Sequence, residues 1–268
     1  MYKTRLINQL TLKTKKMIKK DKAIEQERYD SRAINHIKSN SSNQKKTILD
    51  IPLIHRKPYI VYEDYLKSIL DKNIKVLEIG SGTGEHTYSI IKSGADITAS
   101  DISPNSLNIL QKRYKNYKNF QTKVADMESL PFDSNSFDLV CSAGSLSYGN
   151  HTMVRNEIER VLKPYGYFVC VDSLNHNPIY IANRFINYLK KDRSISTIKR
   201  IPSLNLILSY EKIFKVEKIS FHGSLIWLSP LISFIFGDKS ASNLLDWFDR
   251  KIKVKKSAFK FVFLLRKR

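Results

Sequence analysis

The sequence predicts an α/β fold in which a mainly parallel sheet carries helices on both faces. Two observations point to this fold class. Short apolar runs typical of buried strands alternate along the chain with helical or turn-rich stretches. The chain also has 268 residues, 42% of them hydrophobic, which is enough to build a substantial core.

Seven segments have the composition of strands. They are KVLEI (75–79), DITAS (96–100), NFQTKVAD (119–126), FDLVCS (137–142), YFVCVDS (167–173), FKVEKISF (214–221) and SAFKFVFLLR (257–266). The last segment places alternate apolar residues on one face of its strand: Phe259, Phe261, Phe263 and Leu265.

Three helices are predicted from spacing and composition. They span about 21–38, 59–70 and 156–166, and the third is expected to end at Pro164 and Gly166. The first has apolar positions at every fourth residue, the spacing of one helical face: Tyr29, Ala33 and Ile37.

The charge distribution divides the chain into three parts. Lys and Arg number 46 against 25 Asp and Glu, giving a net charge of +21. The flanks, 1–50 and 177–268, carry 13 basic against 5 acidic and 19 against 6, whereas residues 51–176 carry 14 of each. This partition indicates an anionic partner.

The domain organisation follows from composition. Residues 1–50 are interpreted as a basic N-terminal extension with a flexible connection at 39–46. Residues 51–268 are expected to form the main domain, with insertions at 176–212 and 223–256.

The first residues lack the apolar centre of a secretory signal, so we expect a cytoplasmic protein. Cys141 and Cys170 lie in apolar runs and are expected to be reduced core thiols. The sequence shows no metal-ligand spacing, and we predict a metal-independent protein.

The most informative segment is VLEIGSGTGEHT (76–87), in which Glu78 ends a strand and three alternating glycines follow. Glycine is required where the backbone turns sharply against a ligand. A dinucleotide-binding loop would need glycine at position 85. The sequence has Glu85 there, and its carboxylate would face the pyrophosphate. The Gly-Lys-Ser/Thr ending of a nucleoside triphosphate loop is also absent. The motif therefore argues against both common nucleotide sites.

At this motif the sequence resembles the class I S-adenosylmethionine-dependent methyltransferases, whose first motif is E/D-x-G-x-G-x-G. The resemblance is close over about 59–173 and looser over the terminal strands. It implies a Rossmann-like, seven-stranded, mainly parallel sheet with an antiparallel last strand. It also implies S-adenosyl-L-methionine as the cofactor.

The resemblance assigns roles to several residues. Asp101 matches the carboxylate that binds both ribose hydroxyls, and Glu78 matches the acid that faces the methionine amino group. Asp126 and Met127 match the positions that read the adenine amino group and cover the ring. The other cofactor positions that it implies are Gly80, Gly82, Gly84, Ile102 and Ser142.

Methyl transfer requires an aligned acceptor and a group that removes its proton. The acceptor should lie beyond the carboxyl ends of the fourth and fifth strands. His176, four residues beyond Asp172, is the preferred base; the alternative is a loop histidine satisfied by backbone. Tyr148 is expected to orient the acceptor or to close over the sulfonium.

The acceptor is indicated by resemblance and by elimination. SAGSLSYG follows the fourth strand without the prolines of exocyclic-amine methyltransferases, which disfavours a nucleic acid amine without excluding it. Together with VDSLNHNPIY (171–180) and KSAFKFVFLLR (256–266), this stretch resembles methyltransferases of bacterial surface-polysaccharide clusters. That resemblance implies a sugar hydroxyl on a nucleotide-linked or lipid-linked glycan. An RNA-modifying enzyme, another small-molecule acceptor and a non-enzymatic scaffold are the alternatives.

Both insertions admit two readings. Residues 176–200 mix aromatic and basic side chains that suit a sugar diphosphate or RNA, or form a solvated helix face. In residues 223–256, SLIWLSPLISFIF is too short to span a bilayer. The preferred interpretation is a lid over the acceptor. The other is an interfacial element that holds the protein on the inner face of an anionic membrane.

Overall fold

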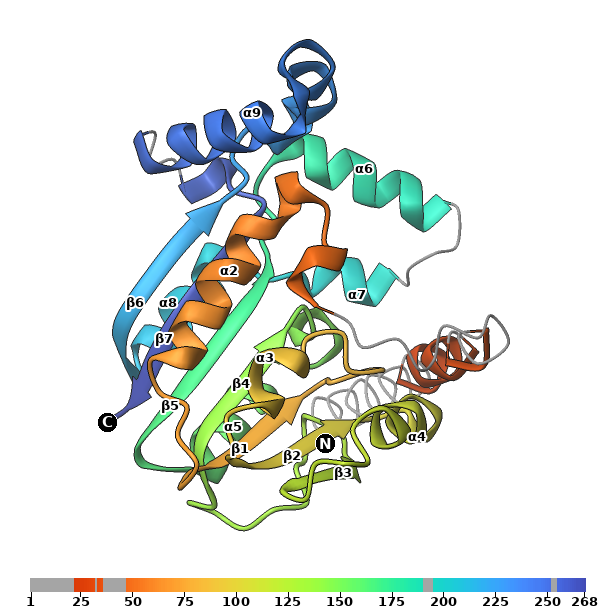
Figure 1. Ribbon diagram of the computed structural model, residues 1–268, viewed down its shortest axis with the longest axis vertical. Coiled ribbons are helices and arrows are strands. Elements are labelled where there is room, and N and C mark those ends of the chain that lie inside the picture. Colours follow the sequence, from red (N-terminus) through yellow and green to blue (C-terminus); the bar gives the residue numbers. More distant parts are fainter. Residues whose placement is uncertain (1–21, 32, 36–46, 190–194, 252–254) are drawn as a thin grey trace, which may run out of the picture.

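The computed structural model describes residues 22–31, 33–35, 47–189, 195–251 and 255–268. A seven-stranded sheet with the order β3-β2-β1-β4-β5-β7-β6 forms its centre (Figure 1). The strands are β1 (Lys75–Ile79), β2 (Asp96–Asp101), β3 (Phe120–Val124), β4 (Phe137–Ala143), β5 (Leu162–Ser173), β6 (Phe214–His222) and β7 (Lys260–Lys267). β7 runs antiparallel to both of its neighbours, and the pairs among β1 to β5 are parallel. The predicted mainly parallel sheet with an antiparallel last strand is confirmed.

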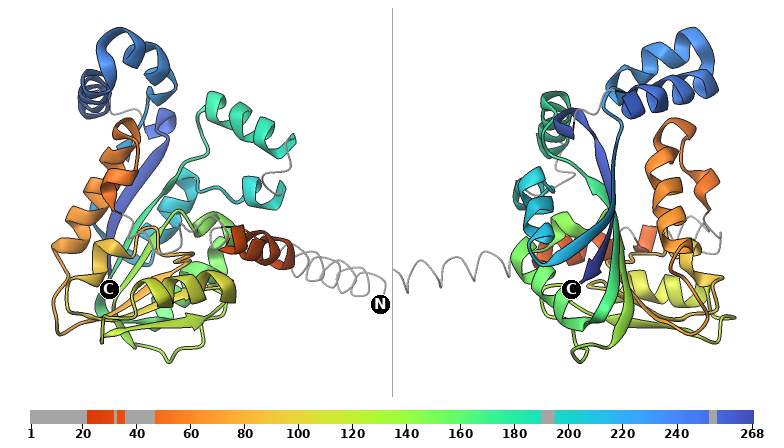
Figure 2. Two further views of the ribbon diagram at one scale, coloured as in Figure 1. Left: turned by 45° about the vertical axis from the view of Figure 1, so that its right-hand side comes forward. Right: turned by 90° about the vertical axis from the view of Figure 1, so that its left-hand side faces the viewer.

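Helices cover both faces of this sheet, also as predicted (Figures 1 and 2). They are α2 (Leu53–Lys67), α3 (Tyr88–Ile91), α4 (Pro104–Arg113), α5 (His151–Val161), α6 (Pro178–Leu189), α7 (Ile195–Lys199), α8 (Leu204–Glu211) and α9 (Ser229–Lys251). Single 3₁₀ turns form η2 (Ile48–Asp50), η3 (Leu146–Tyr148), η4 (Ile226–Leu228) and η5 (Lys255–Ser257).

The alternation of side chains along the strands divides the core into two layers. Phe261, Phe263 and Leu265 of β7 pack on one face, together with buried residues of α5 and α8. Val262 and Leu264 pack on the other face, against buried residues of α2, α3 and α4. This division confirms the face predicted from the spacing of the last strand. Cys141 and Cys170 are both buried, and burial raises the pKa of each thiol.

The helix predicted over 156–166 is wrong in its second half, because α5 ends at Val161 and β5 begins at Leu162. Proline disfavours the helical conformation of the residue before it and donates no backbone hydrogen bond. Pro164 therefore excludes Lys163 from the helix. Leu162 instead pairs with Phe137 of β4, and the strand continues through the expected turn.

The helix predicted over 59–70 begins earlier, at Leu53, and ends at Lys67. Pro58 lies inside it, close to its start. The N-terminal helix (residues 22–31) falls within the segment predicted to contain one. The flexible connection predicted at 39–46 and residues 1–20 lie outside the described residues.

The two predicted insertions contain helices. α6, α7 and α8 lie between β5 and β6, and η4 and α9 lie between β6 and β7. α9 bends at Gly237, whose φ of 76° interrupts the helix and leaves two helical parts, 229–236 and 238–251. No helix among the residues that the structure describes is long and apolar enough to cross a membrane.

Candidate active site

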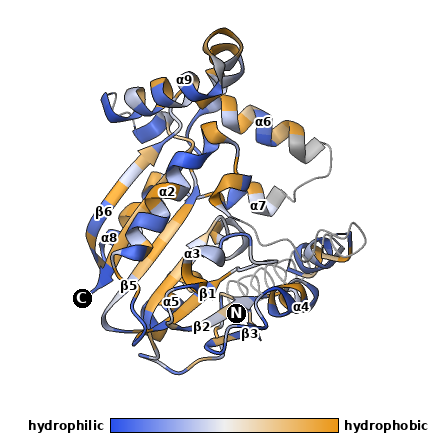
Figure 3. Cartoon of the chain, viewed as in Figure 1, coloured by the Kyte–Doolittle hydropathy of each residue, from blue (hydrophilic) through white to orange (hydrophobic). Residues whose placement is uncertain are grey.

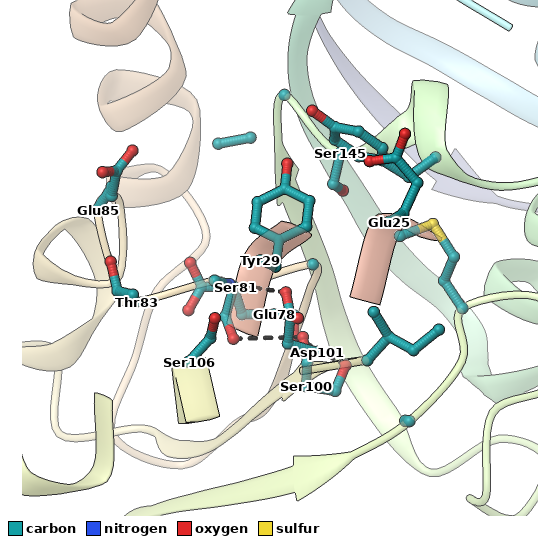
Figure 4. Close-up of a pocket in the computed structure, with 18 of the residues that line it drawn as sticks. Glu25, Tyr29, Glu78, Ser81, Thr83, Glu85, Ser100, Asp101, Ser106 and Ser145 are labelled. Carbon is teal, nitrogen blue, oxygen red and sulfur yellow. Dashed lines mark hydrogen bonds between the residues drawn. The ribbon is translucent and has the colours of Figure 1, made fainter. Parts of the chain in front are cut away.

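A cavity opens at the carboxyl ends of β1 to β4, where the loops that follow these strands meet (Figure 4). This is the position at which an open parallel sheet binds its ligands. Eight residues expected from the sequence line it: Glu78, Gly80, Gly82, Asp101, Ile102, Asp126, Met127 and Tyr148. The structure thus brings together side chains that are up to 70 positions apart in the sequence.

The glycine loop after β1 leaves room only for a residue without a side chain at Gly80. Its φ of 64° is unfavourable for other residues, and an added Cβ would lie 2.4 Å from the Cβ of Ser145. Ser145 follows β4, so this close approach joins the loops after β1 and β4 on one wall of the cavity.

Asp101, at the end of β2, holds the same loop from the other side. Its carboxylate accepts hydrogen bonds from the backbone amides of Gly82 (2.8 Å) and Ser103 (2.9 Å). Burial raises the pKa of this carboxyl, and the two amide hydrogen bonds oppose the rise. The carboxylate lies at the cavity wall, where the hydroxyls of a vicinal diol would find an anionic acceptor.

Glu78 is the most deeply buried acid of the cavity, with 3% of its surface exposed. The Thr87 hydroxyl donates a hydrogen bond of 2.7 Å to its carboxylate. Burial is the largest cause that raises its pKa, to about 7, and the charge of Asp101 adds to the rise. A buried carboxyl of this kind favours a cationic partner, which would stabilise its charged form.

The third acid, Asp126, is held by groups on two sides. One oxygen accepts the backbone amide of Glu128 at 3.0 Å, and the other pairs with the ammonium of Lys22. The same ammonium lies 2.6 Å from the carboxylate of Glu128. Met127, next to Asp126, contributes the apolar part of this wall.

The N-terminal helix supplies one wall of the cavity, which the sequence did not indicate. Its residues Lys22, Glu25 and Tyr29 line the cavity. Figure 4 shows the side chains of Glu25 and Tyr29 beside the loops that follow the strands. The ring of Tyr29 meets that of Tyr148 edge-on, with centroids 5.4 Å apart. Glu25, only 7% exposed, accepts a hydrogen bond from Thr197 of α7 at 2.7 Å.

The two candidate catalytic residues lie in different places. Tyr148 lines the cavity, with the Arg28 guanidinium 5.7 Å from its ring centre. His176 is not among the cavity residues, and its Nε2 accepts a hydrogen bond of 2.8 Å from the Leu204 amide. A ring nitrogen engaged in this way is not available to take a proton from an acceptor. His86, which the sequence did not single out, does line the cavity and stacks on Tyr59.

Gly84 and Ser142 lie behind the cavity rather than on its surface. A Cβ at Gly84 would lie 2.2 Å from the side chain of Leu110, so this glycine allows α4 to pack closely against the loop. The Ser142 hydroxyl forms a hydrogen bond of 2.6 Å with that of Ser145. Both residues support the loops that form the walls.

The described residues fit S-adenosylmethionine. The buried carboxyl of Glu78 suits a cationic amino group, Asp101 suits a diol, and Asp126 beside Met127 suits a polar-edged aromatic ring. The absence of a Cβ at Gly80 leaves the loop backbone accessible to a ligand. Among the described residues, no group of three or more His, Cys, Asp or Glu is placed to hold a metal ion.

The close contact at Gly80 yields a first prediction. Gly80→Ala should lower affinity for S-adenosylhomocysteine at least about tenfold, because the added methyl must displace Ser145 from the wall. Gly94→Ala is the matched control: its φ of 81° imposes a similar backbone penalty, but its nearest neighbour would be 3.4 Å away and outside the cavity. Calorimetric titration measures both affinities. Equal losses in the two variants would contradict the prediction.

Comparison with known proteins supports the same assignment. Residues 77–170 match the family described as "Methyltransferase domain". A sterol 4-C-methyltransferase of Caenorhabditis elegans is 34% identical over 112 residues, which are 40% of this chain and 34% of that protein. A demethylmenaquinone methyltransferase of Tropheryma whipplei is 33% identical over 117 residues, 43% of this chain and 48% of that protein. The chain thus spans half or less of the length of these relatives.

Solved structures resemble the fold over a larger part of the chain. Geranyl diphosphate C-methyltransferase from Streptomyces coelicolor A3(2) superposes with a TM-score of 0.57 at 16% identity, covering 80% of this chain and 81% of that one. That structure was determined with S-adenosyl-L-homocysteine bound. Residues 77–170 therefore match a methyltransferase domain, and the chain around them shares the fold of solved class I methyltransferases.

Proposed function

We propose that this chain transfers a methyl group from S-adenosylmethionine to a small-molecule acceptor. The observation that carries the proposal is the cavity at the carboxyl ends of β1 to β4. There, the buried acid Glu78 and the Asp101–Gly82 hydrogen bond lie within the segment that matches the methyltransferase domain.

The residues have distinct tasks in this proposal. When bound, S-adenosylmethionine would supply an electrophilic methyl group: the acceptor nucleophile would bond to the methyl carbon, the S–CH3 bond would break, and S-adenosylhomocysteine would leave as a neutral thioether. Glu78 pairs with the cationic amino group, and Asp101 accepts hydrogen bonds from the ribose. Tyr29 and the N-terminal helix exclude water from one side of the cavity. Tyr148 orients the acceptor, while the catalytic task first assigned to His176 is not retained because of its hydrogen bond to Leu204.

The acceptor that we favour is a small apolar molecule with a ring or an isoprenoid chain. Tyr29 and Tyr148 offer aromatic surface in the cavity. The relatives named above are called sterol and demethylmenaquinone methyltransferases, and the structural neighbour is called a geranyl diphosphate methyltransferase. These names support an acceptor of lipid type.

A sugar hydroxyl on a nucleotide-linked or lipid-linked glycan is the second candidate, supported by the sequence resemblance around SAGSLSYG (142–149). RNA is supported by the net charge of +21, by the basic N-terminal extension and by the aromatic and basic side chains of 176–200. An anionic group on the acceptor would suit the basic flank in either case.

Labelled methyl transfer into a fractionated extract of the producing organism tests the acceptor class. We expect label from S-adenosylmethionine to enter a small molecule that is soluble in organic solvent. Label in a water-soluble sugar nucleotide, or in an extracted lipid from which mild acid releases a labelled sugar, would instead favour the second candidate. Label that remains with RNA would contradict both, and absence of transfer into every fraction would overturn the proposed activity.

The ribose assignment predicts that Asp101→Asn weakens cofactor binding by about 10- to 100-fold, since hydrogen bonds to charged groups contribute ~1.5–3 kcal/mol. Asp96→Asn is the control, because Asp96 begins the same strand and is exposed. Calorimetry with S-adenosylhomocysteine gives the affinities, and circular dichroism shows whether both variants fold. Unchanged affinity of a folded Asp101→Asn protein would remove the assignment.

The raised pKa of Glu78 leads us to expect that folding stability and cofactor affinity change with pH in opposite directions. Since its pKa is raised to about 7, its contribution to folding stability is present below about pH 4.5 and is lost as pH rises through 7. Binding a cationic amino group needs the carboxylate, so cofactor affinity should fall roughly tenfold for each pH unit below about 7. Calorimetry and thermal unfolding between pH 5.5 and about 8 measure the two trends.

The variant Glu78→Gln serves as the control, because it has nearly the same shape and cannot ionise. It should flatten both pH profiles while the protein stays folded. If wild-type affinity is independent of pH over this range, Glu78 does not pair with the amino group.

A further inference from the structure

The first part of α9 exposes a cluster of large apolar side chains, which we call the α9 tip. Phe234 is 89% exposed, and its neighbours are 58–61% exposed. The members of the α9 tip are Leu231, Phe234, Ile235 and Phe236. Contiguous exposed apolar surface of this kind marks an interaction site rather than ordinary protein surface.

The α9 tip does not extend the core. Of the buried residues in α9, Ala241 and Leu245 belong to the second part, and the first part contributes only Ser229. The second part packs on α2, whereas the bend at Gly237 directs the first part away from it (Figure 2). No residue of 223–251 is among those that line the cavity, so the lining of the cavity gives the lid interpretation no support.

Further exposed apolar residues lie at the same end of the molecule. α6 exposes four of them, Ile179, Ile181, Phe185 and Ile186, at 43–57%. Figures 1 and 3 place α6 and α9 together beyond the carboxyl ends of β5 and β6, with apolar ribbon along α6 and the outermost turn of α9. Trp227 and Trp247 are 42% and 48% exposed. Tryptophan is enriched where protein meets the headgroup layer of a membrane.

Around α9, the basic side chains are exposed, whereas two of the three acidic side chains contact other parts of the protein. The exposed basic residues from its bend to η5 are Lys239, Arg250, Lys251, Lys255 and Lys256. The acids are turned towards the protein: Asp249 accepts the backbone amides of Gly223 (2.6 Å) and Ser224 (2.9 Å). Asp246 lies 4.0 Å from Lys57. Asp238 is the one acid of the described part of α9 that is classed as exposed.

We propose that the α9 tip, with the exposed face of α6, docks on the surface of an anionic lipid bilayer. The apolar side chains enter the interface, and the basic residues at the end of α9 and in η5 contact the headgroups. The positive charge around α9 favours an anionic bilayer over a second copy of the chain as the partner of this surface. Two copies would bring like charges together, whereas anionic lipid complements them. The proposal goes beyond the proposed methyl transfer and does not depend on it.

Vesicle flotation tests the apolar part of the surface. The full chain should float with vesicles of phosphatidylcholine and phosphatidylglycerol. A triple variant of the α9 tip should lose about tenfold or more in partition, because three large side chains no longer enter the interface. The substitutions are Phe234→Ser, Ile235→Ser and Phe236→Ser.

The matched control removes exposed apolar residues from other surfaces and should float like the wild type. Its substitutions are Leu49→Ser, Met153→Ser and Leu208→Ser, at residues that are 47–71% exposed.

A second pair of variants tests the charges. Replacing four basic residues beside α9 should weaken partition about tenfold or more, given ~1 kcal/mol for each charge near the surface. These substitutions are Arg250→Gln, Lys251→Gln, Lys255→Gln and Lys256→Gln.

The charge control removes the same number of exposed lysines at the opposite edge of the sheet, around α4 and β3. Its substitutions are Lys112→Gln, Lys115→Gln, Lys118→Gln and Lys123→Gln. Its partition should change less than threefold, because salt screens charges that lie farther from the membrane than about one Debye length. The circular dichroism spectrum should be unchanged in all four variants, which shows that they fold whether or not the chain binds S-adenosylhomocysteine.

Three results would overturn the proposal. They are failure of the wild type to float at low salt, equal flotation of the tip variant and its control, and a tip-dependent dimer in ultracentrifugation without vesicle binding. Failure of methyl transfer is separate. A chain that floats without methylating leaves the docking surface intact, and one that methylates without floating refutes the docking surface alone.

Discussion

The carboxylate of Asp101 connects the parts on which the cavity depends. By accepting the amides of Gly82 and Ser103, it fixes the loop after β1 against the loop after β2. The same group remains at the cavity wall to meet a ligand. A single side chain thus sets the shape of the loop and contributes an anionic acceptor, and its burial keeps water from competing for either task.

The glycine loop, the acids and the sheet were predictable because they depend on local patterns. Strand length, alternation and the spacing of Glu78 from the glycines depend on neighbouring residues in the sequence, and the resemblance supplied the number of strands and the antiparallel last strand. The end of α5 was misplaced because the preference of Pro164 for extended backbone competes with a helical pattern that continues past Val161. There the pairing of Leu162 with β4 decides the outcome.

Tertiary partners were not predictable in the same way. The four-residue spacing of Tyr29 and Ala33 indicated a helix with one apolar face, and Ala33 is indeed fully buried. No pattern among neighbouring residues indicates that Tyr29 contacts Tyr148. The same holds for the pairing of Lys22 with Asp126, which is more than 100 positions away. His176 illustrates the reverse case. Its distance from Asp172 along the chain suggested a base, whereas its ring nitrogen binds the amide that begins α8.

The place of β7 has a consequence for how the chain folds during synthesis. β7 pairs with both β5 and β6, although it follows both in the sequence and is separated from β6 by α9. On the ribosome, β5 can pair with β4 along one edge, but its other edge and the strand β6 have no partner among the earlier strands of the described sheet. Open edges of this kind attract other chains, so the nascent protein is most exposed to aggregation until β7 emerges and inserts between them.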